Sequence, residues 1–159
     1  MTTLYVNDSG DFREACDQEI IRCAQGVLGK RFRAGSPVLT SPERTQEFLR
    51  IRLATLDYEV FGCLYVDKRH RLIKAEDLFR GTIDGAIVHP RELIRAVILN
   101  GAAAVVLYHN HPSGQATPSQ ADELITTRLR DALALIDVRL LDHIIVGDSA
   151  YSFAEHGLI

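Results

Sequence analysis

Tryptophan, paired cysteines and long apolar runs are all missing from this chain of 159 residues. Its three cysteines form no Cys-x-x-Cys pair, which favours buried, reduced thiols in a cytosolic protein. The longest apolar stretch, residues 102–108, is far short of the ~20 residues that a membrane span requires. The first residues also lack the basic and apolar segments of a signal peptide. We therefore expect a soluble, cytoplasmic protein.

An excess of positive charge is absent as well. The 18 Lys and Arg residues against 21 Asp and Glu residues give a net charge of −3. This balance argues against a domain-wide basic face that would bind nucleic acid non-specifically. Two short basic clusters, residues 30–33 and 68–71, could contact phosphate locally, although a solvated surface is the simpler explanation.

Three competing site motifs are not found in the sequence. Without His-Glu-x-x-His, the zinc site of helix-borne metalloproteases is excluded. Without Pro-Cys-x-x-Cys, the zinc site of cytidine deaminases is excluded. No glycine-rich loop precedes a helix, so a phosphate-binding loop is not predicted.

The composition, 47% hydrophobic and 25% charged, is that of a globular protein, and a chain of this length can bury roughly 70% of its unfolded surface. The break at Gly35-Ser36-Pro37 predicts an N-terminal helical extension over residues 1–36 and a main domain over residues 37–159. Within the extension, residues 1–10 are polar and expected to fray, and apolar positions recur at helical spacing over 11–33.

The main domain alternates apolar strands with helices. Residues 60–66 and 103–109 are apolar on both faces, as in strands that helices cover on both sides, and residues 138–146 are predicted to form a third strand. Ser41-Pro42 is a typical helix start, and Asn100-Gly101 is a typical helix end. The pattern predicts an α/β fold with a mixed sheet flanked by helices. Further helices are expected over 42–53, 90–100 and 118–136, and shorter strands over 72–75, 86–88 and 151–153.

The sequence has six histidines, and two of them, His109 and His111, are separated by a single residue at the end of a predicted strand. Side chains two apart on a strand project to the same side, so both rings could bind one metal ion. Asp122 lies in the first turn of the next predicted helix and could lean back toward them. Two nitrogens, one oxygen and an open fourth position form the ligand set of a catalytic zinc ion.

Each half of this pattern also has a purely structural explanation. A His-x-His pair at a strand end often only hydrogen-bonds backbone carbonyls. Ser119-x-x-Asp122 resembles a helix capping box, which needs no metal. Neither explanation accounts for the turn that joins the two features at a length suited to bringing them together.

The string His109–Gly114 followed by Pro118–Asp122 resembles the JAMM signature of MPN+/JAB-domain metalloproteins, and more closely the RadC family. The resemblance extends over about residues 37–159 and implies an MPN/JAB-type mixed sheet. The chain is most similar to the short RadC-like proteins that lack a helix-hairpin-helix region, and at this length we expect no separate DNA-binding module. Supporting strings are residues 79–82, 89–92 and 141–147.

The resemblance also implies roles for individual residues. His109, His111 and Asp122 would hold Zn²⁺, Glu59 would be the catalytic acid or base, and Ser119 would donate to the oxyanion. Glu59 precedes an otherwise apolar strand, where partial burial would raise its pKa toward the range of a general base. The alternative is an exposed carboxylate at a strand end.

The remaining histidines are weaker candidates. We expect His143 to be structural or to hydrogen-bond a metal-bound imidazole. His70 is expected in a solvated turn, His89 at a helix entry, and His156 near a disordered end of the chain.

The leading hypothesis is a JAMM-type zinc-dependent hydrolase, similar to metallopeptidases or isopeptidases, in which metal-activated water attacks an amide carbonyl. The alternative is a DNA-associated protein, either a metal-dependent phosphodiesterase or a non-catalytic accessory. It is motivated by the DNA repair name attached to the RadC family and by the two basic clusters. A third possibility is an interaction module without turnover. The natural peptide or isopeptide substrate and the oligomeric state are left open.

Overall fold

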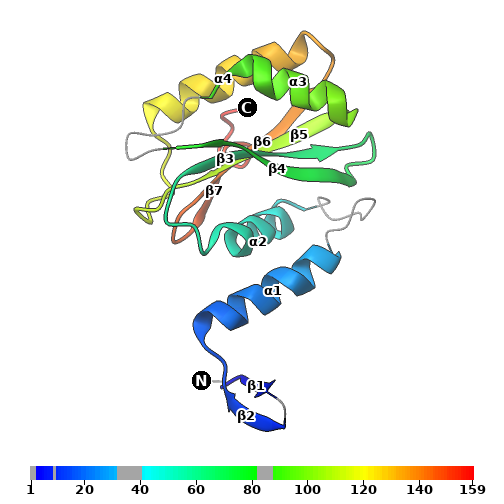
Figure 1. Ribbon diagram of the computed structural model, residues 1–159. Coiled ribbons are helices and arrows are strands. Elements are labelled where there is room, and N and C mark those ends of the chain that lie inside the picture. Colours follow the sequence, from blue (N-terminus) through cyan, green and yellow to red (C-terminus); the bar gives the residue numbers. More distant parts are fainter. Residues whose placement is uncertain (1–2, 9, 32–40, 82–87) are drawn as a thin grey trace.

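A five-stranded mixed sheet forms the centre of the protein, in the order β4-β3-β5-β6-β7 (Figure 1). The computed structural model describes residues 3–8, 10–31, 41–81 and 88–159. Only β5 and β6 pair in parallel, while the other neighbours in this sheet are antiparallel. The strands are β3 (Val60–Val66), β4 (Leu72–Arg80), β5 (Ala104–Asn110), β6 (Arg139–Val146) and β7 (Ala150–Ser152).

Helices cover both faces of this sheet. Helix α2 (Pro42–Leu53) lies on one face, and α3 (Pro90–Asn100) and α4 (Gln120–Ala134) lie on the other (Figure 1). Each face has its own core, one around Leu49 and Leu64 and the other around Leu93 and Leu129. Every residue of β3 and β5 is therefore buried, which confirms the prediction drawn from their apolar sequences.

The helix ends follow the local sequence signals. Ser41 caps α2 by accepting a hydrogen bond from the backbone N–H of Arg44, and Pro42 occupies the first helical position. Helix α3 ends at Gly101, whose left-handed conformation (φ 61°) suits glycine.

The N-terminal segment differs from its prediction. Strands β1 (Tyr5–Asp8) and β2 (Asp11–Glu14) pair as an antiparallel hairpin, and helix α1 begins only at Asp17 and continues to Arg31. The helix predicted from residue 11 is therefore wrong over 11–14, and paired strands replace the expected frayed start. The reason is local: the Asn7 side chain accepts from the Gly10 N–H, and Gly10 takes the positive φ that this turn requires.

Two smaller predictions also change. Cys63 is buried as expected, but Cys16 and Cys23 are exposed on the N-terminal segment. The strand predicted over 86–88 falls mostly outside the described residues, and Val88 itself is not in a strand. Among the helices that the structure describes, none combines the length and the apolar character that crossing a membrane demands.

The central strands approach each other most closely at Gly62. This residue pairs with Tyr108, whose fully buried ring lies directly over it. A Cβ atom at position 62 would lie only 2.2 Å from Cζ of Tyr108. The ring cannot move aside easily, because its hydroxyl donates to Asp77 and burial surrounds it on all sides.

We expect Gly62→Ala to destabilise the protein by about 3 kcal/mol or more, because the methyl group would overlap a buried aromatic ring. Urea denaturation followed by circular dichroism measures the change. Gly26→Ala is the matched control, since a Cβ at position 26 in α1 meets no atom within 4 Å. The control should change the free energy of unfolding by less than about 1 kcal/mol. An equal effect of both substitutions would contradict the packing described here.

Candidate metal centre

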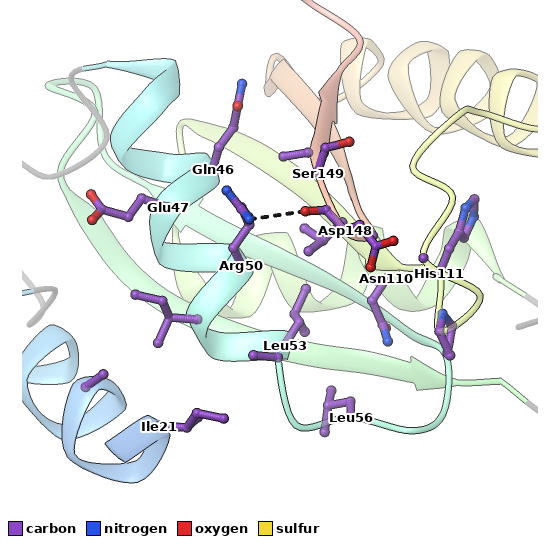
Figure 2. A pocket seen from close by; sticks show the side chains of 18 of the residues that line it. Ile21, Gln46, Glu47, Arg50, Leu53, Leu56, Asn110, His111, Asp148 and Ser149 are labelled. Carbon is purple, nitrogen blue, oxygen red and sulfur yellow. Dashed lines mark hydrogen bonds between the residues drawn. The ribbon is translucent and has the colours of Figure 1, made fainter. Parts of the chain in front are cut away.

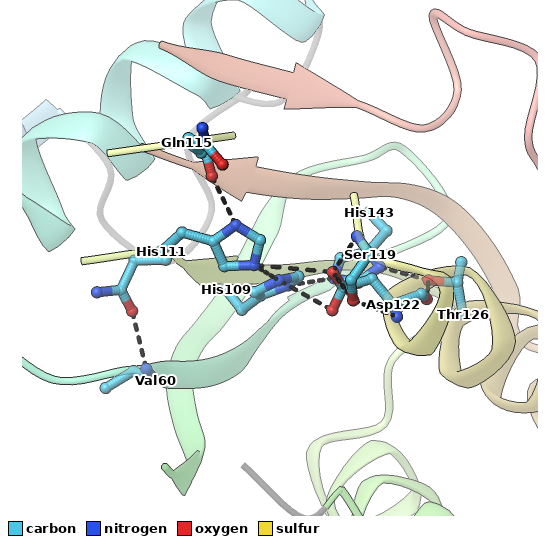
Figure 3. Close-up of polar contacts among 9 residues, drawn as sticks. Val60, His109, His111, Gln115, Ser119, Asp122, Thr126 and His143 are labelled. Atoms are coloured by element: carbon cyan, nitrogen blue, oxygen red, sulfur yellow. Dashed lines mark hydrogen bonds and ion pairs between the residues drawn. The ribbon is translucent and has the colours of Figure 1, made fainter. Parts of the chain in front are cut away.

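Two imidazole rings meet at the end of β5. His109 is the penultimate residue of this strand and is 1% exposed, and His111 follows it on the same side. Their Nε2 atoms lie 2.9 Å apart. The predicted convergence of the two side chains is therefore present in the structure (Figure 3).

Asp122 reaches the histidines from the start of α4. Its Oδ1 lies 3.2 Å from Nε2 of His109, and its Oδ2 lies 3.7 Å from Nε2 of His111. The same carboxylate forms a capping box: Oδ2 accepts from the backbone N–H and the hydroxyl of Ser119, both at 2.7 Å. Asp122 therefore both caps the helix and approaches the histidines, because one carboxylate has enough lone pairs for both interactions.

Glu59 is held beside the histidines by Asn110. The Asn110 side chain is buried, accepts from the backbone N–H of Val60 (2.8 Å) and donates to the carbonyl of Tyr58 (2.9 Å). These two bonds fix the residues on either side of Glu59. As a result, one ligand atom from Glu59 and one from each histidine all lie within 4.8 Å of one another, a group that could hold a metal ion.

A buried hydrogen-bond chain determines the tautomer of His109. Thr126 donates its only hydroxyl proton to the carbonyl of Asp122 (2.6 Å), so its oxygen accepts from Nδ1 of His143 (2.5 Å). Nε2 of the neutral His143 then accepts from Nδ1 of His109 (2.9 Å). With its proton on Nδ1, His109 presents the lone pair of Nε2 to the site.

A backbone carbonyl determines the tautomer of His111. Its Nδ1 lies 2.6 Å from the carbonyl oxygen of Gln115, and because a carbonyl only accepts, Nδ1 carries the proton. The turn that supplies this carbonyl depends on Gly114, which adopts φ 87° and accepts a hydrogen bond from the Asp148 N–H. The lone pair of His111 Nε2 is therefore also free.

Three acceptors thus converge with no hydrogen atom between them. Both Nε2 atoms and the Asp122 carboxylate lie 2.9 to 3.7 Å apart. Such a cluster needs a cation at its centre, either a proton on one ring or a metal ion. Four tetrahedral ligands at the zinc–nitrogen distance would lie about 3.3 Å apart. The observed spacing brackets this value, so the residues present fit a zinc ion.

The site also controls the charges of its members. Burial raises the pKa of Asp122, but the interaction with His109 when that ring carries the proton, together with the hydrogen bonds from Ser119, outweighs burial and holds the pKa well below the usual range. Burial, reinforced by repulsion from His109, lowers the pKa of His143 well below its usual value. At neutral pH the site therefore combines an ionised carboxylate with a neutral supporting imidazole.

The other four histidines lie at different places in the fold. His143 contacts His109 directly, in the supporting position that the sequence predicted. His89 is the N-cap residue of α3, also as predicted. His70 lies in the turn after β3 with a φ of 57°, and its Nε2 lies 3.2 Å from a nitrogen of Arg139. The disorder expected around His156 is wrong, because this ring stacks on Tyr151 with 4.0 Å between centroids.

Three contributors to the site were not identified from the sequence. Asn110 was not singled out, although its position between the two histidines could have indicated a role at the site. Thr126 lies four residues after Asp122, one helical turn away, a spacing that places it under the carboxylate. The contribution of Gln115 is a backbone carbonyl, which no side-chain pattern reveals.

The fold and the site together define a class: an α/β protein whose mixed sheet carries a His-x-His pair at the end of a buried strand, with carboxylates from two other segments beside it. A family model described as the RadC-like JAB domain matches residues 39–158. The chain belongs to this RadC-like JAB domain family, as its motifs indicated.

Its relatives include several called UPF0758 protein. One from Thioalkalivibrio sulfidiphilus is 53% identical over 150 residues, covering 94% of this chain and 67% of the relative. Another from Nitrosococcus oceani is 60% identical over 123 residues, covering 77% of this chain but only 55% of the relative. A third, from Vibrio cholerae, is 50% identical, and the match covers 89% of both chains. The chain therefore corresponds to just over half of some relatives and most of others.

We expect Thr126→Val to weaken zinc binding by about 10- to 100-fold. Without the hydroxyl, Nδ1 of His143 loses its acceptor, and His143 can place its proton on Nε2, which drives the proton of His109 toward the site. Competition with a chromogenic chelator measures the affinity. Thr127→Val is the matched control, because Thr127 is exposed on the same helix. Equal zinc affinity in both variants would show that this chain does not orient His109.

Proposed function

We propose that this protein is a zinc-dependent hydrolase of amide or isopeptide bonds, with His109, His111 and Asp122 as metal ligands and Glu59 as general base. The observation that carries the proposal is the convergence of three lone-pair acceptors at 2.9 to 3.7 Å, with both Nδ1 protons committed to other partners. Zinc bound there with one open position would supply a Lewis acid and an activated water molecule at neutral pH.

Glu59 is suited to move protons at this site. It lies between two residues whose backbones Asn110 fixes, and its own carbonyl accepts from the Gly81 N–H at 2.8 Å. The rigid backbone leaves the carboxylate within one water molecule of the histidine nitrogens. Glu59 would take a proton from the attacking water and deliver it to the leaving amine nitrogen.

Ser119 would support the oxyanion that develops on the carbonyl oxygen. Its hydroxyl donates to Asp122 in the present structure, and the residue is exposed at the start of α4. To donate to a substrate, the hydroxyl would rotate away from Asp122, which keeps its bond from the Ser119 backbone N–H. This role stays a prediction.

Amide hydrolysis is favoured over action on DNA by the charges around the site. Without a metal the charge around the site is mainly negative: three carboxylates, those of Glu59, Asp122 and the nearby Asp57, face one cation, Arg80. The basic cluster over 68–71 lies in the turn after β3, at the end of that strand away from Glu59, and its Arg71 is paired with Asp67. The side chains of the cluster over 30–33 fall outside the described residues.

Glu59→Gln and Asp122→Asn together distinguish the roles of the two carboxylates. We expect Glu59→Gln to retain about one equivalent of zinc and to lose hydrolysis by about 10²- to 10⁴-fold, because a neutral amide cannot accept the proton. Asp122→Asn preserves an acceptor for the helix cap but should lose zinc. Elemental analysis of protein purified without added metal measures occupancy, and peptide, isopeptide and DNA substrates measure activity.

Glu123→Gln is the control, because this exposed carboxylate lies next to Asp122 on α4. Loss of zinc in Glu59→Gln with retention in Asp122→Asn would instead make Glu59 the third ligand. Less than about half an equivalent of zinc in the unmodified protein, unchanged in Asp122→Asn, would overturn the metal site. Cleavage of DNA but of no peptide would favour the phosphodiesterase alternative.

A further inference from the structure

Two separate spaces meet at the histidine turn. The larger, about 790 Å³, is a cleft between α2 and the loop after β6, and its wall includes Arg50, Asp148 and His111 (Figure 2). The smaller, about 470 Å³, is lined by Glu59, Arg80 and Ser113, among others. His111 and Pro112 line both spaces, so the two spaces adjoin at the histidine turn beside the candidate metal centre.

Arg80 is held in place in the smaller space. It is the last residue of β4 and pairs with Val60, and the next residue, Gly81, donates its N–H to the Glu59 carbonyl. Its guanidinium carbon lies 3.6 Å from the centroid of the Tyr58 ring. Stacking on an aromatic ring fixes the plane of a guanidinium and leaves its N–H groups free to bind a ligand.

The guanidinium of Arg80 has no acidic partner among the residues that the structure describes. On the same strand Lys74 pairs with Glu76, and Asp77 of that strand pairs with Arg52. A guanidinium that is fixed in this way, with no acidic partner in the described part of the chain, is a binding site for a planar anion, which it can contact through two parallel N–H···O bonds.

We propose that Arg80 binds the free C-terminal carboxylate of a peptide substrate, so that the enzyme removes a short C-terminal piece. This inference rests on the proposed hydrolase function. A single carboxylate suits this space, because Asp57 and Glu59 also line it and would repel a phosphodiester chain with a charge at every nucleotide. The volume of the space is at the small end of ligand pockets, about 300–1,000 Å³, as befits a short leaving segment.

The two spaces then give the substrate a direction. The longer acyl part would occupy the larger cleft beside α2, and the segment with the free carboxylate would occupy the Arg80 space. In the reaction the amide C–N bond breaks, and the water oxygen forms a new bond to the carbonyl carbon. The proton that Glu59 takes from the water goes to the departing nitrogen, so the products are a shortened carboxylate and a free amino acid or short peptide.

The test compares pairs of peptides that differ only in a C-terminal carboxylate or carboxamide. With zinc-loaded protein we expect kcat/KM to favour the free acid by about tenfold, the value of one charged hydrogen-bonded contact. Arg80→Gln should abolish this preference, and Arg80→Lys should restore only part of it, because lysine lacks the planar fork. Arg69→Gln is the control, since Arg69 is exposed in the turn beyond the far end of β3.

Binding provides a second readout that does not depend on turnover. Calorimetry with N-acetylglycylglycine and its amide, on metal-free protein and on zinc-loaded Glu59→Gln, should show the same preference for the acid and its loss in Arg80→Gln. Equal cleavage and equal binding of acid and amide would overturn the inference but leave the hydrolase intact. A binding preference without cleavage of any peptide would support the carboxylate-binding role of Arg80 and overturn the proposed hydrolase function.

Two further probes identify the anion. If Arg80→Gln weakens binding of a short single-stranded oligonucleotide but not of N-acetylglycylglycine, Arg80 is a nucleic-acid contact and the inference is wrong. Inorganic phosphate should bind the unmodified protein no more tightly than N-acetylglycylglycine does. Circular dichroism spectra of the Arg80 variants establish that they are folded.

Discussion

The site depends on two hydrogen bonds from one amide side chain. Asn110 connects the end of β5 to the backbone on both sides of Glu59, and it does so where water is excluded. Unsatisfied, the buried N–H of Val60 would cost about 1–3 kcal/mol, so this connection is strongly favoured. The residue that separates the two histidines therefore also places the carboxylate that faces them, and through Tyr58 it supports Arg80.

A second set of constraints acts on protons. The carbonyls of Asp122 and Gln115 can only accept, and each determines the tautomer of one histidine, directly or through Thr126 and His143. The lone pairs and the carboxylate repel one another, and the stability of the fold offsets this repulsion because the sheet and α4 hold these groups in place. The geometry of such a site follows from the fold, unlike that of small zinc domains that fold around the metal.

Local sequence patterns predicted most of the sheet and the convergence of the histidine pair with the start of the next helix. The apolar strands around 60–66 and 104–110 and the Ser-Pro helix start depend on neighbours in the chain, and so does the link from Ser119 to Asp122. Contacts across the sheet were beyond such patterns. Glu59 meets the histidines only because β3 and β5 pair in one register, with Phe61 opposite His109. The N-terminal hairpin was missed because its apolar residues are also consistent with helical spacing.

Asp122 closes the first turn of α4 and faces the histidines with the same carboxylate. Two unrelated structural roles therefore fall on one residue. A descendant that lost metal binding would still gain helix stability from the Ser-x-x-Asp sequence, at about 1 kcal/mol for a good cap. In comparisons among relatives, the histidine pair and the threonine beneath it are accordingly better markers of a working centre than the aspartate.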